Sequence, residues 1–119
     1  MGINRRVIGE QGEDLAVKAL KECGYKILER NFRCRFGEID IIARDEETTV
    51  FIEVKARNNN KFGLAEEAVD YRKQQKIRQV AEFYLLINDN PARDCRFDVC
   101  CVSFKEKEGP GVKILKNCF

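Results

Sequence analysis

The chain has 119 residues, of which 44% are hydrophobic and 35% charged, and its formal net charge is +2. This is the composition of a soluble globular protein, and it excludes a disordered chain; the length predicts one domain over residues 1–119. No apolar run approaches the length of a transmembrane helix, so we expect no membrane association. The sequence has no histidine, which excludes Ser-His-Asp triads, Cys-His dyads and histidine general bases.

The six cysteines do not indicate a secreted, disulfide-linked protein. The N-terminus is polar and charged from Asn4 onward, so we expect no signal peptide and a reduced, cytoplasmic protein. Three of the cysteines lie in apolar runs, where cysteine serves as a small hydrophobic residue. Without a C-x-x-C pair or any histidine, a zinc site is not expected.

Apolar residues at helical spacing predict a first helix over residues 5–22. Small residues at Gly9, Gly12 and Ala16 would let this helix approach a sheet closely. Glu13 lies near that same side of the helix rather than on its open face. Two interpretations of Glu13 are therefore open: a carboxylate that belongs to a site, or a boundary residue whose charged group reaches water.

The remaining elements follow in alternation with polar or glycine-rich turns. The pattern predicts a bent strand over residues 25–34 and a β-hairpin of residues 38–43 and 50–55. A second helix, broken near Asp70, is predicted over residues 64–87, and two further strands over residues 96–104 and 112–115. The order is αβββαββ. The second helix provides a crossover, which favours a parallel strand pair within an otherwise antiparallel sheet. We therefore predict an α/β fold with a mixed sheet.

The register of the hairpin follows from counting. Pairing across a turn at Glu46–Glu47 places Ile41 opposite Ile52 and Asp40 opposite Glu53. Each apolar residue of one strand then meets an apolar residue of the other. The predicted apolar face consists of Ile39, Ile41, Ala43, Val50, Ile52 and Val54.

The opposite face of this hairpin holds an unusual pair of charges. Asp40 and Glu53 would repel each other directly across the strands, and burying them costs desolvation. A hard divalent cation such as Mg²⁺ or Mn²⁺ resolves that conflict, because it prefers carboxylate oxygens. The alternative is a solvated polar face on an amphipathic hairpin, in which Glu38 pairs with Lys55.

Several segments together resemble the bacterial YraN family. They begin with the pattern from Gly9 to Ala16 in the first helix, and the others are Gly37-Glu38-Ile39-Asp40, Phe51-Ile52-Glu53-Val54-Lys55-Ala56-Arg57, Phe62-Gly63 and Arg96-Phe97-Asp98-Val99. The resemblance covers most of the chain. That family is similar in fold to the restriction-endonuclease-like PD-(D/E)XK nucleases, with a pattern reminiscent of Holliday-junction resolvases. It implies a three-layer core, in which helices flank the mixed sheet.

The resemblance also implies catalytic residues. Asp40 stands at the motif aspartate, Glu53 and Lys55 stand at the (D/E)XK positions, and Glu13 stands at the helix carboxylate of resolvase-like members. Ile39 stands where the PD-(D/E)XK superfamily motif has its proline, which is dispensable in many members of that superfamily. The implied cofactor is Mg²⁺ or Mn²⁺, and its ligands would be Asp40, Glu53, the backbone carbonyl of Val54, and Glu13.

Basic residues would contact phosphates, and those singled out are Lys73, Arg72, Arg57 and Lys76. Lys73 taken alone is better interpreted as a solvated lysine on a helix. Two functions are open: a metal-dependent endonuclease that cuts structured or damaged DNA, or a nuclease-fold module that binds nucleic acid or a protein partner with little activity. DNA is favoured over RNA as the partner. The small domain favours a homodimer that shares a DNA surface, or a subunit of a larger assembly.

Overall fold

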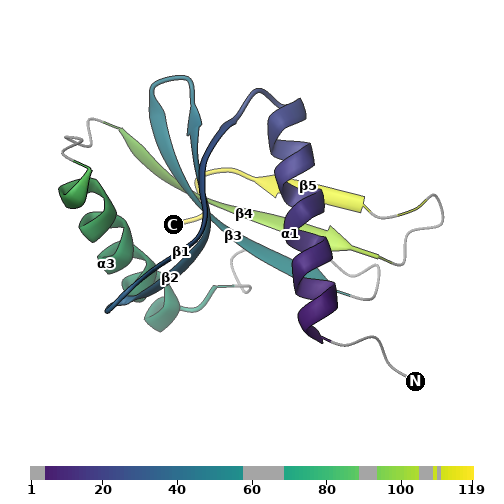
Figure 1. Cartoon of the computed structure of the whole chain (residues 1–119), viewed down its shortest axis with the longest axis horizontal. Helices are drawn as coiled ribbons and strands as arrows, with labels where there is room; N and C mark the ends of the chain where they lie inside the picture. The colour runs from purple at the N-terminus through teal and green to yellow at the C-terminus, as the bar shows by residue number, and fades with distance from the viewer. Residues whose placement is uncertain (1–4, 58–68, 89–93, 105–108, 110) are drawn as a thin grey trace.

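The structure, a computed structural model, describes residues 5–57, 69–88, 94–104, 109 and 111–119, with only the backbone of residues 5–8 and 57. Its elements are α1 (Arg5–Glu22), β1 (Lys26–Cys34), β2 (Gly37–Asp45), β3 (Thr48–Arg57), α3 (Tyr71–Ile87), β4 (Cys95–Ser103) and β5 (Gly111–Leu115) (Figure 1). The predicted order αβββαββ is confirmed. The predicted helical residues 64–68 lie outside the described part of the chain.

The strands form one sheet in the order β1-β2-β3-β4-β5, so β3 is central. All neighbouring strands are antiparallel except β3 and β4, which are parallel. Parallel neighbours need a crossover connection, and α3 lies in that connection. The predicted mixed sheet is therefore confirmed. Neither helix in the described ranges is both long and apolar enough to cross a membrane.

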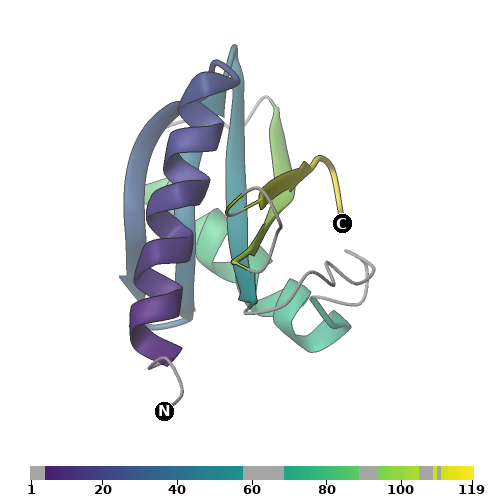
Figure 2. The same ribbon diagram turned by 90° about the vertical axis from the view of Figure 1, so that its right-hand side faces the viewer.

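Each face of the sheet has its own helix and its own hydrophobic cluster. The cluster on the α1 side includes Ala16, Leu20, Ile41, Ala43, Val50, Ile52 and Cys100. The cluster on the α3 side includes Ile39, Ile42, Phe51, Ile77, Val80, Phe97 and Cys101. Figure 1 shows α1 crossing β3, β4 and β5, with α3 beside the β1–β2 hairpin, and Figure 2 shows α1 running along one side of the sheet. Two adjacent cysteines of β4 thus serve opposite cores as small hydrophobic residues.

The close approach of α1 to the sheet depends on Gly12. A Cβ atom at Gly12 would lie 2.5 Å from the Cβ of Ala56 on β3, a distance that real Cβ atoms do not adopt. Gly9 has nothing within 4 Å of the corresponding position, so its small size is not needed for this contact. Glu13 follows Gly12 and is therefore brought against the sheet.

The hairpin register is confirmed along the described ladder, which runs from Asp45–Thr48 to Ile41–Ile52. One prediction about its faces is wrong. Ile41 packs in the cluster under α1, as predicted, whereas Ile39 packs in the cluster under α3. Residues two apart in a regular strand share a face, so the alternation is interrupted between them, at Asp40.

The interruption has a counterpart on β1. The pairs Arg30–Ile41 and Phe32–Ile39 place Asn31 against Asp40. Asn31 has a φ of 54°, in the left-handed region, which asparagine tolerates better than most other residues. The twist at this point turns both strands over, and this explains why Ile39 changes face.

A buried carboxylate ties three parts of the fold together. Asp98 is 0% exposed, and it accepts hydrogen bonds from the Tyr25 hydroxyl at 3.0 Å, the Arg96 Nε at 2.9 Å and the Asn117 N–H at 2.9 Å. Arg96 also pairs with Asp45 at 2.9 Å. A buried charge is tolerated when it is paired and hydrogen-bonded in this way. Asp98 therefore joins β4 to the residue that precedes β1 and to the C-terminal tail.

Truncation of the central hairpin pair should be strongly destabilising. Ile41 and Ile52 are 0% and 1% exposed, so Ile41→Ala or Ile52→Ala should lower the free energy of unfolding. The expected loss in urea denaturation is about 2–5 kcal/mol. Ile87→Ala, at a site that is 56% exposed, is the control and should change stability little. Equal losses at all three sites would contradict the register.

Candidate functional site

The site begins where β2 and β3 separate. Beyond the Ile41–Ile52 pair, the Val54 N–H donates to the Oδ2 of Asp40 at 2.8 Å. The Asp40 side chain thus occupies the place of a backbone carbonyl in the ladder. A strand residue presents its N–H and its C=O to the same neighbour, so the Val54 carbonyl is directed to this same opening.

Glu53 approaches Asp40 from the face of the sheet that α3 covers. Phe51 packs in the α3 cluster, and strand alternation places Glu53 and Lys55 on the same side. Burial raises the pKa of Asp40 to about 7, and the charges of Glu53 and Glu13 raise it as well, against the lowering effects of the Val54 hydrogen bond and Lys73. The predicted convergence of carboxylates is therefore visible in the electrostatics of Asp40.

Lys73 of α3 completes this group. Its Nζ lies 2.5 Å from the Oε1 of Glu53, whose side chain is only 9% exposed. Burial lowers the pKa of Lys73, but the hydrogen bond and charge of Glu53 outweigh it, and the net shift is upward. The interpretation of Lys73 as a solvated helix lysine is wrong. Asp70 caps α3 by accepting from the Lys73 N–H at 2.8 Å, which fixes the backbone from which this side chain extends.

Lys55 lies next to the carboxylates of Asp40 and Glu53. Burial lowers its pKa, and the neighbouring ammonium of Lys73 lowers it further, while Glu53 and Asp40 oppose the shift. Glu38, which the solvated-face interpretation paired with Lys55, pairs instead with Arg33 at 2.9 Å. Lys55 is therefore part of the carboxylate group rather than of a surface ion pair.

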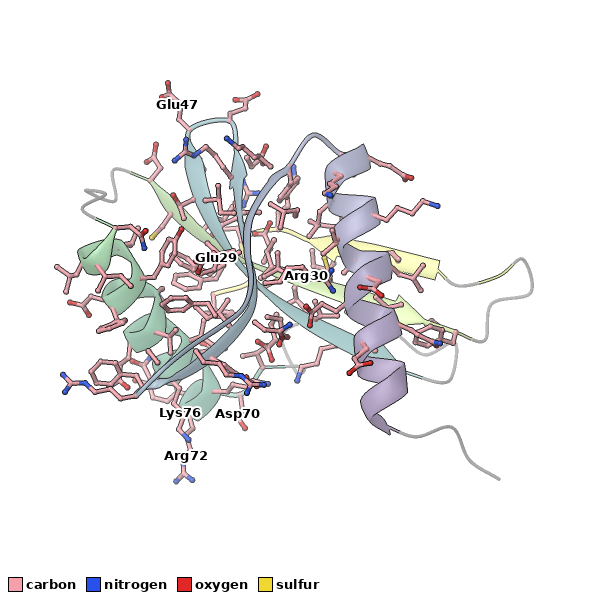
Figure 3. All side chains as sticks on the ribbon, in the orientation of Figure 1. Glu29, Arg30, Glu47, Asp70, Arg72 and Lys76 are labelled. Atoms are coloured by element: carbon pink, nitrogen blue, oxygen red, sulfur yellow. The ribbon has the colours of Figure 1, made fainter. Side chains whose placement is uncertain are left out.

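Glu13 is held by β1 rather than by water. Its side chain is 12% exposed, and its Oε1 accepts from Arg30 Nε at 3.0 Å and from Asn31 Nδ2 at 2.9 Å. Figure 3 shows Arg30 beside α1. The interpretation of Glu13 as a boundary carboxylate with its charged group in water is wrong. Sequence reasoning missed Arg30 and Asn31, because a contact across 17 or 18 positions leaves no local pattern.

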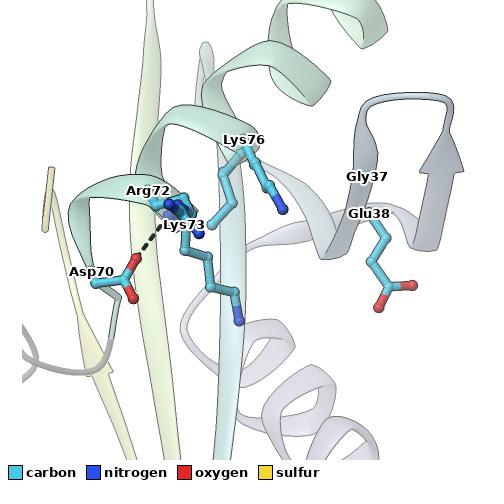
Figure 4. Close-up of a pocket in the computed structure, with 7 residues that line it drawn as sticks. Gly37, Glu38, Asp70, Arg72, Lys73 and Lys76 are labelled. Atoms are coloured by element: carbon cyan, nitrogen blue, oxygen red, sulfur yellow. Dashed lines mark hydrogen bonds between the residues drawn. The ribbon is translucent and has the colours of Figure 1, made fainter.

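A groove of about 320 Å³ opens between the start of α3 and the start of β2. Three predicted phosphate-binding residues line it, namely Arg72, Lys73 and Lys76, together with Asp70, Ile77, Gly37 and Glu38. Figure 3 shows Asp70, Arg72 and Lys76 gathered at the start of α3, and Figure 4 shows Lys73 and Lys76 projecting from that helix. The side chain of Arg57, the fourth predicted contact, lies outside the described residues.

The oxygen atoms at the strand opening suit a hard divalent cation. Asp40, Glu53 and the Val54 carbonyl supply oxygen ligands, and a cation would relieve the repulsion that raises the pKa of Asp40. In the described ranges, however, no three carboxylate or thiol side chains are gathered closely enough to hold a metal. Glu13 is engaged by Arg30 and Asn31, and Glu53 by Lys73. The residues present therefore fit a site of two carboxylates and one carbonyl, provided that Lys73 moves.

The sequence matches the family described as "Uncharacterised protein family UPF0102" over residues 12–102. A UPF0102 protein of Syntrophus aciditrophicus is 49% identical over 111 residues, which cover 93% of this chain and 87% of that protein. A UPF0102 protein of Desulforamulus reducens is 46% identical, with 98% of both chains covered. A third, of Moorella thermoacetica, is 44% identical, with 100% of both covered. Every residue of the site described above falls within the matched range.

The raised pKa of Asp40 should appear as a pH dependence of stability. The pKa lies at about 7 in the folded protein against 3.8 ordinarily, so the folded state is favoured at low pH and loses that stability as the pH rises through 7. Asp40→Asn removes this titration. Its unfolding free energy relative to wild type should therefore rise between about pH 4 and pH 8, by about 1–4 kcal/mol.

Urea denaturation at a series of pH values measures this difference. Asp94→Asn, at an exposed aspartate, is the matched control and should follow the wild type. Parallel stability profiles for Asp40→Asn and wild type would show that Asp40 is not strained by its neighbours.

Proposed function

This chain belongs to protein family UPF0102. We propose that it is a metal-dependent nuclease that hydrolyses phosphodiester bonds in DNA. The observation that carries the proposal is the convergence of Asp40 and Glu53 at the opening between β2 and β3, with Lys55 beside them. A groove rich in cations adjoins this point. The resemblance to PD-(D/E)XK nucleases supports the same activity.

Asp40, Glu53 and the Val54 carbonyl are the residues that would hold Mg²⁺ or Mn²⁺. Such an ion, when bound, supplies polarisation of a phosphodiester and a lowered pKa for water. Glu13 would act on the metal electrostatically and not as a direct ligand. Arg30 and Asn31 hold its carboxylate in place, and its charge still raises the pKa of Asp40. Glu13 is thus proposed to strengthen the attraction of the site for a cation.

Lys55 is the proposed donor to the charge that develops on the phosphate oxygens. A preorganised ammonium in a partly buried site stabilises such charge more strongly than water does. Its lowered pKa also makes transfer of a proton to the leaving oxygen easier. The role depends on Lys55 acting in the transition state rather than in binding.

Arg72 and Lys76 would position the DNA backbone in the groove without reading its sequence. The resemblance to Holliday-junction resolvases extends the proposal to junction or repair DNA as the substrate. A homodimer would give two such grooves and a longer DNA surface.

A nuclease-fold binding module with little activity is the second candidate. The charges of the site are already balanced within the chain, since Lys73 neutralises Glu53, and Arg30 binds Glu13. Such a site persists without a metal. A role in binding nucleic acid or a protein partner would need only the groove and the fold.

Cleavage of linear, flapped and four-way-junction DNA in Mg²⁺ or Mn²⁺ separates the two candidates. We expect wild type to cut at least one substrate, Glu53→Gln to cut none, and Lys55→Ala to lose at least about 100-fold in rate at nearly unchanged DNA affinity. Glu82→Gln, on the exposed side of α3, is the control for a neutralised glutamate and should cut normally. A wild type that cuts nothing, yet binds DNA as tightly as Glu53→Gln does, would favour the binding module.

The groove makes a separate prediction about affinity. Replacing Arg72 and Lys76 together by Ala should weaken DNA binding and reduce the slope of log K against log salt concentration by about 2, because two phosphate contacts are lost. Fluorescence anisotropy over a salt series measures both effects. Lys18 and Lys21, exposed on α1, give a control pair of equal charge. The same slope in both double variants would remove the groove from the DNA surface.

A further inference from the structure

Lys73 takes part in two features of the molecule at once. Its side chain lines the groove beside Arg72 and Lys76, and its Nζ pairs with Glu53 at 2.5 Å. The Lys73 side chain is 42% exposed, whereas that of Glu53 is 9% exposed. One ammonium group is therefore accessible from the groove while it neutralises a buried carboxylate.

The charge balance around Glu53 disfavours the presence of both the Lys73 ammonium and a metal ion. Asp40 and Glu53 carry two negative charges when ionised, and Lys55 and Lys73 carry two positive charges. A divalent cation at the carboxylates would add two further positive charges against these ammonium groups. It would also compete with Lys73 for the Glu53 carboxylate, whose Oε1 the ammonium contacts. Metal binding therefore requires that the Lys73 ammonium leave.

The groove offers a destination for that ammonium. A DNA phosphate between Arg72 and Lys76 would lie beside the third cation that lines the groove, Lys73. The lysine side chain is a flexible stem, so its charge can move while its backbone stays in place. The Asp70 cap holds that backbone through the Lys73 N–H.

We propose that Lys73 is an exchangeable counter-ion that couples DNA binding to metal binding. In the free protein it neutralises Glu53, and a phosphate in the groove draws it away so that a divalent cation takes its place. Each ligand then raises the affinity for the other by the same factor. This inference rests on the proposed nuclease site, and it adds an anion subsite whose occupant is a phosphodiester.

Calorimetric titration of Mn²⁺ into the protein without DNA tests the exchange. Lys73→Met should bind Mn²⁺ at least 10-fold more tightly than wild type, which corresponds to about 1.4 kcal/mol. Lys73→Gln, which keeps a hydrogen-bond donor for Glu53, should show a smaller gain and serves if the methionine variant folds poorly. Lys18→Met, which loses a lysine charge from the exposed face of α1, should match wild type.

A second titration, with a hydrolysis-resistant phosphorothioate oligonucleotide present, tests the coupling. The oligonucleotide should raise the Mn²⁺ affinity of wild type at least 10-fold and that of Lys73→Met by much less. Equal Mn²⁺ affinities for wild type and both Lys73 variants, with binding lost in Asp40→Asn, would overturn the exchange while leaving the metal site intact. Absence of Mn²⁺ binding in every variant, with or without the oligonucleotide, would overturn the metal site and the exchange with it.

Discussion

The hydrogen bond from the Val54 N–H to the Asp40 carboxylate is the constraint on which the site depends. An antiparallel ladder normally satisfies each inward N–H with a backbone carbonyl. Here a charged side chain accepts instead, so the ladder stops at Ile41–Ile52 and the strands separate without leaving that donor unpaired. The separation turns a side chain, a neighbouring carboxylate and a main-chain carbonyl toward one point in the middle of a sheet.

The surrounding fold is arranged to maintain this opening. Gly12 lets α1 approach β3 closely, which places Glu13 against β1. Asn31, opposite Asp40, supplies both the left-handed backbone that turns the strands over and an amide that holds Glu13. From the other face, α3 delivers Lys73 to Glu53. Side chains from the helices on both sides of the sheet therefore reach the same region of it, and the cations Lys73 and Arg30 offset the cost of burying Glu53 and Glu13.

Local sequence patterns predicted most of the fold. The first helix has the predicted bounds, and the hairpin pairs Ile41 with Ile52, because helical periodicity and a two-residue turn are properties of contiguous residues. The parallel pair of β3 and β4 followed from the crossover. Ile39 was assigned to the wrong face, because its position depends on the backbone of Asn31 in another strand.

The candidate site was predictable in its strand residues and not in their partners. Asp40, Glu53 and Lys55 stand out as charges within apolar strands. The pairing of Glu53 with Lys73, and of Glu13 with Arg30, is decided by how the helices pack on the sheet. Long charged side chains can reach several oppositely charged neighbours, and the sequence does not distinguish among these possible ion-pair partners. The packing of the helices on the sheet decides which pair forms.

The buried Asp98 constrains the order in which this protein folds. Arg96 on the same strand neutralises its charge, but its other donors are Tyr25, 73 positions earlier, and Asn117, 19 positions later, so its hydrogen bonds are complete only when both distant segments have arrived. The antiparallel meander of β1, β2 and β3 needs only short loop closures and can form first. Insertion of β4 beside β3 must wait for long-range contacts, which form slowly. We therefore expect the rate-limiting step to be the docking of β4, since an early arrival would bury the Asp98 carboxylate with Arg96 but without its donors from Tyr25 and Asn117.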